Sequence, residues 1–409
     1  MRNWMLDEKK TEEIEDIIIS YRRYIHQNPE LSYEENKTSL TIQSFLKENG
    51  IEFETGFCSN GILAVIKGDK PGAIVALRAD MDALPITEKN TFSYASKQQG
   101  VMHACGHDAH TAMLMGTALA LKEQQSQLAG TVLLVFQPAE EFAPTGGAAQ
   151  MMEDGIFDRY SPDVIVAQHV WPDLPVGKIG VKSGPQMGNS DRFRITIEGS
   201  GGHASMPHQT KDAVIIASEV VSLLQTITSR NVDPLESAVV TVGTISGGDR
   251  YNVIASSAVL EGTVRTFKNQ VKERVKSRME DILLGLERAM DARITLEYMN
   301  GYPATVNSEQ WADHIKKTAV SLFGSDAAPV VQPSLGGEDF GRFLEKYQGV
   351  YYWLGTAIPE REVQKPLHDP EFDIDESALA VGLKMMTTTA LDTLDSLNQK
   401  GGGGSDNTN

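Results

Sequence analysis

Side chains that can bind a metal ion gather in the segment 103–107, which reads His-Ala-Cys-Gly-His. Cys105 and His107 are two residues apart with a glycine between them, and in an extended loop such side chains point the same way. A thiolate and an imidazole are ligands that suit a borderline-soft divalent ion such as zinc. We therefore predict that both bind metal. For the neighbouring His103 and His110 we expect loop hydrogen bonding or helix capping instead.

Two adjacent carboxylates, Glu140 and Glu141, offer a ligand and a base. Pro138 keeps the chain out of a helix just before them, and neighbouring side chains on an extended segment diverge. One carboxylate can then bind metal while the other faces a bound water. A water whose pKa a metal brings towards ~7 needs a base to take its proton. A Glu-Glu pair is usually a solvated acidic turn, but this one directly follows the apolar segment 131–136.

Two further imidazoles, His169 and His368, complete the candidate ligands. Either residue alone is more often a core or loop histidine than a ligand. Together with Cys105, His107 and Glu141 they supply five ligands, enough for two ions if one ligand bridges. A thiolate and a carboxylate leave two such ions with excess positive charge, which attracts hydroxide and polarises a carbonyl.

The segments that carry these residues alternate between strand-like and helix-like patterns. We expect helices at 12–27, 35–49, 109–123, 148–154 and 376–395, and strands at 61–67, 72–77, 131–136, 163–167 and 349–354. This alternation predicts an α/β fold with a mostly parallel sheet. Most of the candidate residues fall just after a predicted strand, where open α/β sheets bind their ligands.

The order of strand-like and helix-like segments changes near the Gly- and Pro-containing segment 182–189. Strands at 192–198, 237–245, 258–266 and 293–298 and helices at 212–228 and 271–290 follow in the ferredoxin-like order β-α-β-β-α-β. We therefore predict a discontinuous catalytic domain (1–187 and 302–399) interrupted by an inserted domain (188–301). The Gly-rich end, 400–409, is predicted to be a flexible tail. One edge of the inserted domain is expected to pair with a second subunit.

The composition and charge of the chain exclude several classes of binding partner. The 409 residues include 37 Lys and Arg against 55 Asp and Glu, a net charge of −18, which argues against nucleic acid or an anionic membrane. No segment approaches ~18 consecutive apolar residues, so no membrane span is expected. Two cysteines provide no disulfide framework and suit a reducing compartment. With no signal-peptide pattern at the amino terminus, a cytoplasmic location is expected.

The motifs at 102–112 (MHACGHDAHTA), 136–141 (FQPAEE) and 336–340 (GGEDF) resemble the amidohydrolase branch of the aminoacylase/carboxypeptidase metallopeptidase family. Hippurate hydrolases, bacterial N-acyl-amino-acid amidohydrolases and plant auxin-conjugate hydrolases belong to this branch. The similarity extends from 22–32 to 368–370, nearly the whole chain. It implies a two-metal catalytic domain, an inserted dimerisation domain, and a homodimer or homotetramer that hydrolyses small N-acyl amino acids.

The resemblance also implies roles for individual residues. Cys105 would bridge the two metals or bind one of them, and the other metal ligands would be His107, Glu141, His169 and His368. Glu140 would be the general base. His203, on the inserted domain, would stabilise the oxyanion, often from the partner subunit. Asn252 and Arg265 match positions that hold the substrate's carboxylate or the oxyanion.

One position departs from the wider family. Arg78 stands where carboxypeptidase-like members carry a metal-binding histidine, and an arginine stays protonated and cannot bind metal. The amidohydrolase branch shares this change, which favours an amidase, with Asp80 in a supporting role.

Three other interpretations stay open. The chain could be a dipeptidase or aminopeptidase on the same scaffold, a metal-bound binding protein without turnover, or a zinc-stabilised scaffold. The metal is also open, because Cys and His favour zinc while a mixed O/N/S site accepts manganese, cobalt or nickel.

Overall fold

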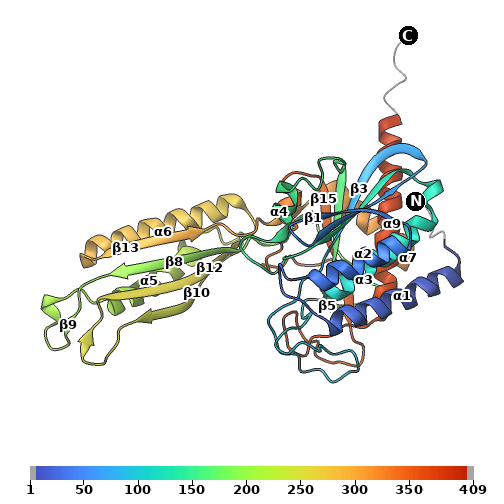
Figure 1. The fold of residues 1–409 in the computed structure, drawn as a ribbon. Helices are drawn as coiled ribbons and strands as arrows, with labels where there is room; N and C mark the ends of the chain where they lie inside the picture. The colour runs from blue at the N-terminus through green and yellow to red at the C-terminus, as the bar shows by residue number, and fades with distance from the viewer. Residues whose placement is uncertain (1–5, 403–409) are drawn as a thin grey trace, which may run out of the picture.

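The computed structural model describes residues 6–402, and they form two bodies, each built around its own sheet (Figure 1). The larger body contains a seven-stranded sheet in the order β1-β2-β4-β3-β5-β15-β6. The smaller body contains a four-stranded sheet that extends away from it. The larger sheet consists of β1 (Glu52–Phe57), β2 (Gly61–Lys67), β3 (Lys70–Asp80), β4 (Ala129–Gln137), β5 (Val164–Pro175), β6 (Ile179–Gly180) and β15 (Gly349–Ala357).

The centre of the large sheet is parallel and its flanks are antiparallel. The neighbouring strands β4, β3, β5 and β15 run in the same direction. The flanking strands β1, β2 and β6 pair antiparallel. The α/β class and the parallel core predicted from the sequence are confirmed, whereas β1 is a strand that the sequence analysis did not identify. The parallel core brings the carboxyl ends of four strands to one edge.

Alternating residues of the central strands build two cores. In β2, Ile62, Ala64 and Ile66 face one side, and Leu63 and Val65 face the other, because successive strand side chains point to opposite faces. Strand β4 alternates in the same way. Both faces of these strands are covered, so β2 is apolar up to Lys67 although it pairs antiparallel, and β4 has the apolar run typical of buried parallel strands.

One face of the sheet is covered by long helices, and the other by short ones with their connecting loops. The helix α1 buries Ile14, Ile18 and Ile25, spaced for one helical face. The helices of this body are α1 (Glu8–Gln27), α2 (Asn36–Glu48), α3 (His107–Glu123), α4 (Gly147–Glu153), α7 (Glu309–Phe323), α8 (Gly341–Leu344) and α9 (Ser377–Gly402). The strands β7 (Gly184–Met187) and β14 (Thr305–Asn307) pair beside it.

The smaller body has the ferredoxin-like order predicted from the sequence. Its sheet is β10-β12-β8-β13, antiparallel throughout, with two helices packed on it. The domain limits at 187/188 and 301/302 stay a prediction. Of the predicted tail, residues 403–409 lie outside the described residues. The elements are β8 (Asp191–Glu198), β9 (Gly202–His203), α5 (Ala213–Arg230), β10 (Ala238–Gly247), β11 (Val253–Ile254), β12 (Ser257–Thr266), α6 (Asn269–Met290) and β13 (Arg293–Met299).

Among the described residues, α5 is one helix that is long and apolar enough to cross a membrane by length and composition. In the structure its residues Ile216, Ala217, Val220 and Leu224 are buried in the core of the small domain. A helix that packs on a sheet passes the same test, so this single helix is weak evidence for a span.

A buried arginine joins the first helix of the chain to its last. The Arg22 side chain is 1% exposed, and its guanidinium donates to Asp108 Oδ2 at 2.9 Å, Glu376 Oε1 at 2.9 Å and Asp373 Oδ1 at 3.3 Å. His26 Nδ1 lies 2.8 Å from the same Asp108 oxygen. Burial opposes ionisation of Asp108, but the charges of Arg22 and His26 outweigh it and lower the pKa of Asp108. Because Asp108 lies in the first turn of α3, the cluster also fixes the start of that helix.

We expect Arg22→Met to lower the free energy of unfolding by about 3–5 kcal/mol, because it leaves buried carboxylates without their cation. Arg23 is a matched control: it pairs with the same Glu376 but is 48% exposed, so Arg23→Met should cost only about 0–1 kcal/mol. Urea unfolding of both variants measures the difference. Equal losses would mean that burial of the Arg22 cluster adds nothing to stability.

Candidate metal centre

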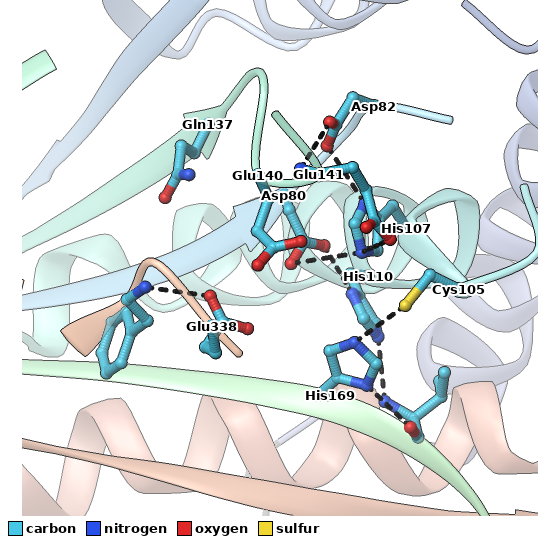
Figure 2. Close-up of polar contacts among 12 residues, drawn as sticks. Asp80, Asp82, Cys105, His107, His110, Gln137, Glu140, Glu141, His169 and Glu338 are labelled. Carbon is cyan, nitrogen blue, oxygen red and sulfur yellow. Dashed lines mark hydrogen bonds and ion pairs between the residues drawn. The ribbon is translucent and has the colours of Figure 1, made fainter. Parts of the chain in front are cut away.

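Four of the five predicted metal ligands, Cys105, His107, Glu141 and His169, lie together at the carboxyl edge of the parallel strands (Figure 2). The fifth, His368, groups with Cys105 and Glu141. Cys105 and His107 lie at the amino end of α3, and Glu141 follows β4. His169 lies within β5 rather than after it, since that strand continues to Pro175. His368 lies in the loop between β15 and α9. Segments far apart in the sequence thus meet at one edge of the sheet.

Among the described residues, five groups of three possible ligand atoms occur here, and the two that consist of predicted ligands alone share the Cys105 sulfur. Within each group all three atoms lie within 4.8 Å of one another. A sulfur common to both groups is the arrangement that a bridging thiolate between two ions requires. The first group is Cys105, His107 and His169, and the second is Cys105, Glu141 and His368.

In two of the predicted ligands, His107 and His169, the Nδ1 atom contacts a protein oxygen and the Nε2 atom points towards the other ligand atoms. His107 Nδ1 lies 3.2 Å from Asp82 Oδ1, and His169 Nδ1 donates to the Val170 carbonyl at 2.7 Å. His169 Nε2 lies 3.5 Å from Cys105 Sγ, and His107 Nε2 is buried without a hydrogen-bond partner. A hydrogen bond of this kind at one ring nitrogen fixes the tautomer that leaves the other free for metal.

The other two histidines of the motif differ from each other. His110 uses both nitrogens, with Nδ1 2.5 Å from Asp80 Oδ1 and Nε2 accepting from Val170 N at 2.9 Å, so the predicted hydrogen-bonding role is confirmed. The same prediction for His103 is wrong, because both of its nitrogens are buried without a hydrogen-bond partner. Burial lowers the pKa of His103 to about 4, which keeps the ring neutral.

The electrostatics of the site fit a cation. Burial disfavours a charged His107, yet Asp80, Asp82 and Glu141 outweigh it and raise its pKa to about 10. Burial and the charges of Glu141 and Glu140 also raise the pKa of the Cys105 thiol. A divalent ion supplies the positive charge that this surplus of carboxylates requires and keeps the thiol ionised. His107 Nε2 has no hydrogen bond among the described residues and lies 3.7 Å from Asp80 Oδ2 and 4.0 Å from Glu141 Oε1, so the residues present fit a bound metal.

Glu140 lies beside the ligands and is 7% exposed. Its Oε1 accepts a long hydrogen bond, 3.4 Å, from the Asp339 amide, and its carbonyl accepts from the Tyr302 hydroxyl at 2.7 Å. Burial, with the nearby charges of Glu338 and Glu141, raises the pKa of Glu140. A buried carboxylate with a raised pKa is well suited to accept and return a proton near neutral pH.

Arg78 neutralises the acidic groups behind the ligands. Its guanidinium is fully buried and donates four hydrogen bonds, and the charges it meets raise its pKa against the effect of burial. It therefore acts as a fixed internal cation, as expected of a residue that cannot bind metal. The acceptors are Asp80 Oδ2 at 2.6 Å, Gln137 Oε1 at 2.8 Å, Glu338 Oε1 at 3.0 Å and Asp339 Oδ1 at 3.0 Å.

The predicted residues of the inserted domain do not reach the ligands within one chain. His203, on β9, and Asn252, next to β11, lie at the tip of the small body, and Figure 1 places β9 at its far end. His203 is exposed, and its Nδ1 accepts from Ser205 N at 3.1 Å. Arg265 lies instead where the two bodies meet: a Cβ at Gly337 would stand 3.0 Å from its Nη1.

Two residues with clear positions in the site were not singled out from the sequence. Asp82 accepts from Glu141 N at 2.9 Å through Oδ2 and contacts His107 through Oδ1, so it orients a residue of each ligand group. Its place in the segment 78–82, directly after a strand, was a usable signal. Tyr302 had no such signal, because its hydroxyl meets Glu140 only through the tertiary fold.

The chain is similar to known proteins over most of its length. A family model described as peptidase family M20/M25/M40 matches residues 76–392. N-acetyl-L-cysteine deacetylase of Bacillus subtilis (strain 168) is 42% identical over 385 residues, 94% of this chain and 89% of that protein. Thermostable carboxypeptidase 2 of Saccharolobus solfataricus is 39% identical over 372 residues, 90% of this chain and 93% of that protein.

Among solved structures, the fold is similar to that of the Bacillus subtilis YXEP protein, described as a dinuclear metal-binding peptidase of the M20 family. The TM-score is 0.82 at 35% identity, covering 94% of this chain and 99% of that one.

We expect Asp82→Asn to weaken metal binding about 10- to 100-fold, the usual effect of removing a carboxylate that orients a ligating histidine. Competition with a chromogenic chelator measures the affinity. Asp154→Asn is the control, since Asp154 Oδ2 accepts from Cys58 N away from the ligands. Unchanged affinity in Asp82→Asn would exclude the orienting role.

Proposed function

The chain belongs to peptidase family M20/M25/M40, and on that premise we propose that it hydrolyses the amide bond of N-acyl amino acids as a two-metal enzyme. The observation that carries this proposal is the pair of ligand groups sharing Cys105, with the buried Glu140 carboxylate beside them. A structural zinc site is closed and needs no base, and a binding protein has no use for one. This arrangement favours catalysis over both.

We propose His107 and His169 as ligands of one ion, Glu141 and His368 as ligands of the other, and Cys105 as the bridge. Two divalent ions held there supply a Lewis acid for the acyl carbonyl and lower the pKa of a bound water. Zinc suits the Cys and His ligands best, and manganese, cobalt and nickel are the alternatives to test.

Glu140 moves the proton in the proposed reaction. Its carboxylate takes a proton from the attacking water, which adds to the acyl carbon. It then returns that proton to the amine nitrogen as the amide bond breaks. Water thus adds across one C–N bond, releasing a carboxylic acid and a free amino acid.

The relatives support two related substrates. The deacetylase relative supports an N-acetyl amino acid, and the carboxypeptidase relative supports a peptide. The absence of a metal-binding histidine at Arg78 supports the amidase. Hydrolysis of N-acetyl-cysteine, N-acetyl-methionine, hippurate and an unblocked dipeptide by the metal-loaded enzyme separates these possibilities. Release of amino acid only from acylated substrates supports the proposal, and cleavage of the dipeptide alone would replace it with a peptidase.

We expect Glu140→Gln to lower kcat by about 100- to 10,000-fold, the range for loss of a general base, while two metal equivalents remain bound. Glu141→Gln should lose metal instead, because it removes a proposed ligand. Glu153→Gln, on the exposed side of α4, should behave as wild type. Metal content by plasma mass spectrometry and turnover by amine release distinguish the three variants. Normal turnover in Glu140→Gln would contradict its role as the base.

We propose that His203 completes the site of a second subunit. Its exposed place at the tip of the small domain, away from the ligands of its own chain, supports a contribution across a homodimer or homotetramer, and Asn252 would enter beside it. Arg265, which lies near Gly337 of its own chain, would contact the substrate's carboxylate. The two free cysteines support a reducing, cytoplasmic location.

Mixing two inactive variants tests this arrangement. If His203 acts across subunits, randomly reassembled Glu140→Gln and His203→Ala dimers contain one intact site in each hybrid, restoring about a quarter of wild-type activity. If it acts within its own chain, no site in any hybrid is intact and the mixture stays inactive. Unmixed samples of each variant are the controls.

A further inference from the structure

The two segments that connect the bodies are fastened to each other at Ser190 and Tyr302. Ser190 N donates to the Tyr302 carbonyl at 3.0 Å, and Tyr302 N donates to Ser190 Oγ at 3.2 Å. The segments pass so closely that a Cβ at Gly301 would lie 1.8 Å from the Ser190 carbonyl oxygen. The two connecting segments are therefore joined directly at Tyr302.

The catalytic segment 139–141 is held by three buried side chains from different parts of the fold. Ala139 adopts a left-handed conformation (φ +58°), which a non-glycine residue keeps only when its surroundings enforce it. The three hydrogen bonds run from Ala139 N to Glu35 Oε1 (2.8 Å), from Glu141 N to Asp82 Oδ2 (2.9 Å), and from the Tyr302 hydroxyl to the Glu140 carbonyl (2.7 Å).

Only the third of these bonds comes from the connection between the bodies. Glu35 and Asp82 belong to the large body alone, where they precede α2 and follow β3. Among residues 6–402, the one hydrogen bond to the Glu140 carboxylate is the long bond from the Asp339 amide, so its direction depends mainly on its own backbone. The Tyr302 hydroxyl donates to that backbone at the Glu140 carbonyl, and Tyr302 is 3% exposed, so water does not compete for this bond.

We propose that Tyr302 is a positioning residue that transmits the orientation of the small domain to the general base. When the small domain turns about the connection, the Tyr302 hydroxyl moves the Glu140 carbonyl, and the carboxylate enters or leaves the position for proton transfer. This inference rests on the proposed role of Glu140. It assigns a catalytic consequence to a hydrogen bond outside both ligand groups.

Tyr302→Phe removes the hydroxyl and keeps the ring. We expect kcat to fall on the order of 10-fold or more, with KM within about twofold and two metal equivalents retained, because the contact orients a group used in the transition state. Tyr298→Phe is the matched control: its hydroxyl also bonds within this connection, to Asp191 Oδ2 at 2.8 Å, but does not contact Glu140. Its kcat should stay within twofold. Equal kcat in Tyr302→Phe and wild type would overturn the inference.

Hydrogen exchange in the metal-free proteins gives a readout independent of turnover. Peptides covering 139–141 should exchange faster in Tyr302→Phe than in wild type or Tyr298→Phe. Unchanged exchange would also overturn the inference. If the wild type hydrolyses none of the substrates, the proposed function fails, whereas the exchange result still decides whether Tyr302 anchors the segment.

A double-mutant cycle tests the link to the domain connection. Ser190→Ala removes the oxygen that accepts from Tyr302 N, so it should lower kcat in the wild-type background and add little in the Tyr302→Phe background. Fully additive effects would mean that Ser190 acts by another route, and the coupling through Tyr302 would be refuted.

Discussion

Charge compensation around Arg78 is the constraint on which the site depends. The guanidinium bonds to Asp80 at the end of β3, to Gln137 at the end of β4, and to Glu338 and Asp339 in the loop before α8. Strands β3 and β4 are parallel neighbours, so one cation reaches both of their ends. The loop before α8 comes from the chain beyond the inserted domain. Arg78 thus joins the two halves of the discontinuous body at the edge where the metal ligands lie.

The carboxylates bonded to Arg78 differ in their electrostatics. Burial opposes ionisation of Asp80, but the charges of His107 and Arg78 outweigh it and lower its pKa, whereas burial raises the pKa of Asp339 to about 7 against the charge of Arg78. Among the described residues, Glu140 and Glu141 accept no hydrogen bond from Arg78, and both lie beside His107. Burial opposes a charged His107, but the nearby carboxylates outweigh it and raise its pKa. This negative charge around His107 would favour cations there. The residues that would hold them are already oriented by contacts within the protein, since Asp82 contacts both His107 and the Glu141 amide.

Local patterns in the sequence predicted most of the secondary structure and the grouping of the candidate ligands. They did not predict contacts between residues that only the tertiary structure brings together. Residue periodicity predicted the apolar strands, the amphipathic helices and the β-α-β-β-α-β order. The grouping of the candidate ligands followed from their positions near strand ends. Strand β1 was missed because its burial is shallow and its sequence, EFETGF, lacks an apolar run. His169 was placed after a strand that in fact continues past it. The contacts of Asp82 and Tyr302 join residues from 25 to 162 positions apart, and no local pattern encodes them. The ligand roles themselves remain a proposal that the grouping supports.

The interrupted architecture has a consequence for how the molecule is made. Strand β5 pairs on one side with β3, but its other partner, β15, lies beyond the whole inserted domain. During synthesis, the large sheet stays incomplete, with an apolar edge and an uncovered face, until β15 and α9 leave the ribosome. The contiguous small domain can already fold before then. Such late, distant pairing slows folding and exposes the unfinished edge to other chains. The insertion that gives the enzyme its second body thereby lengthens the time for which the nascent large domain stays incomplete.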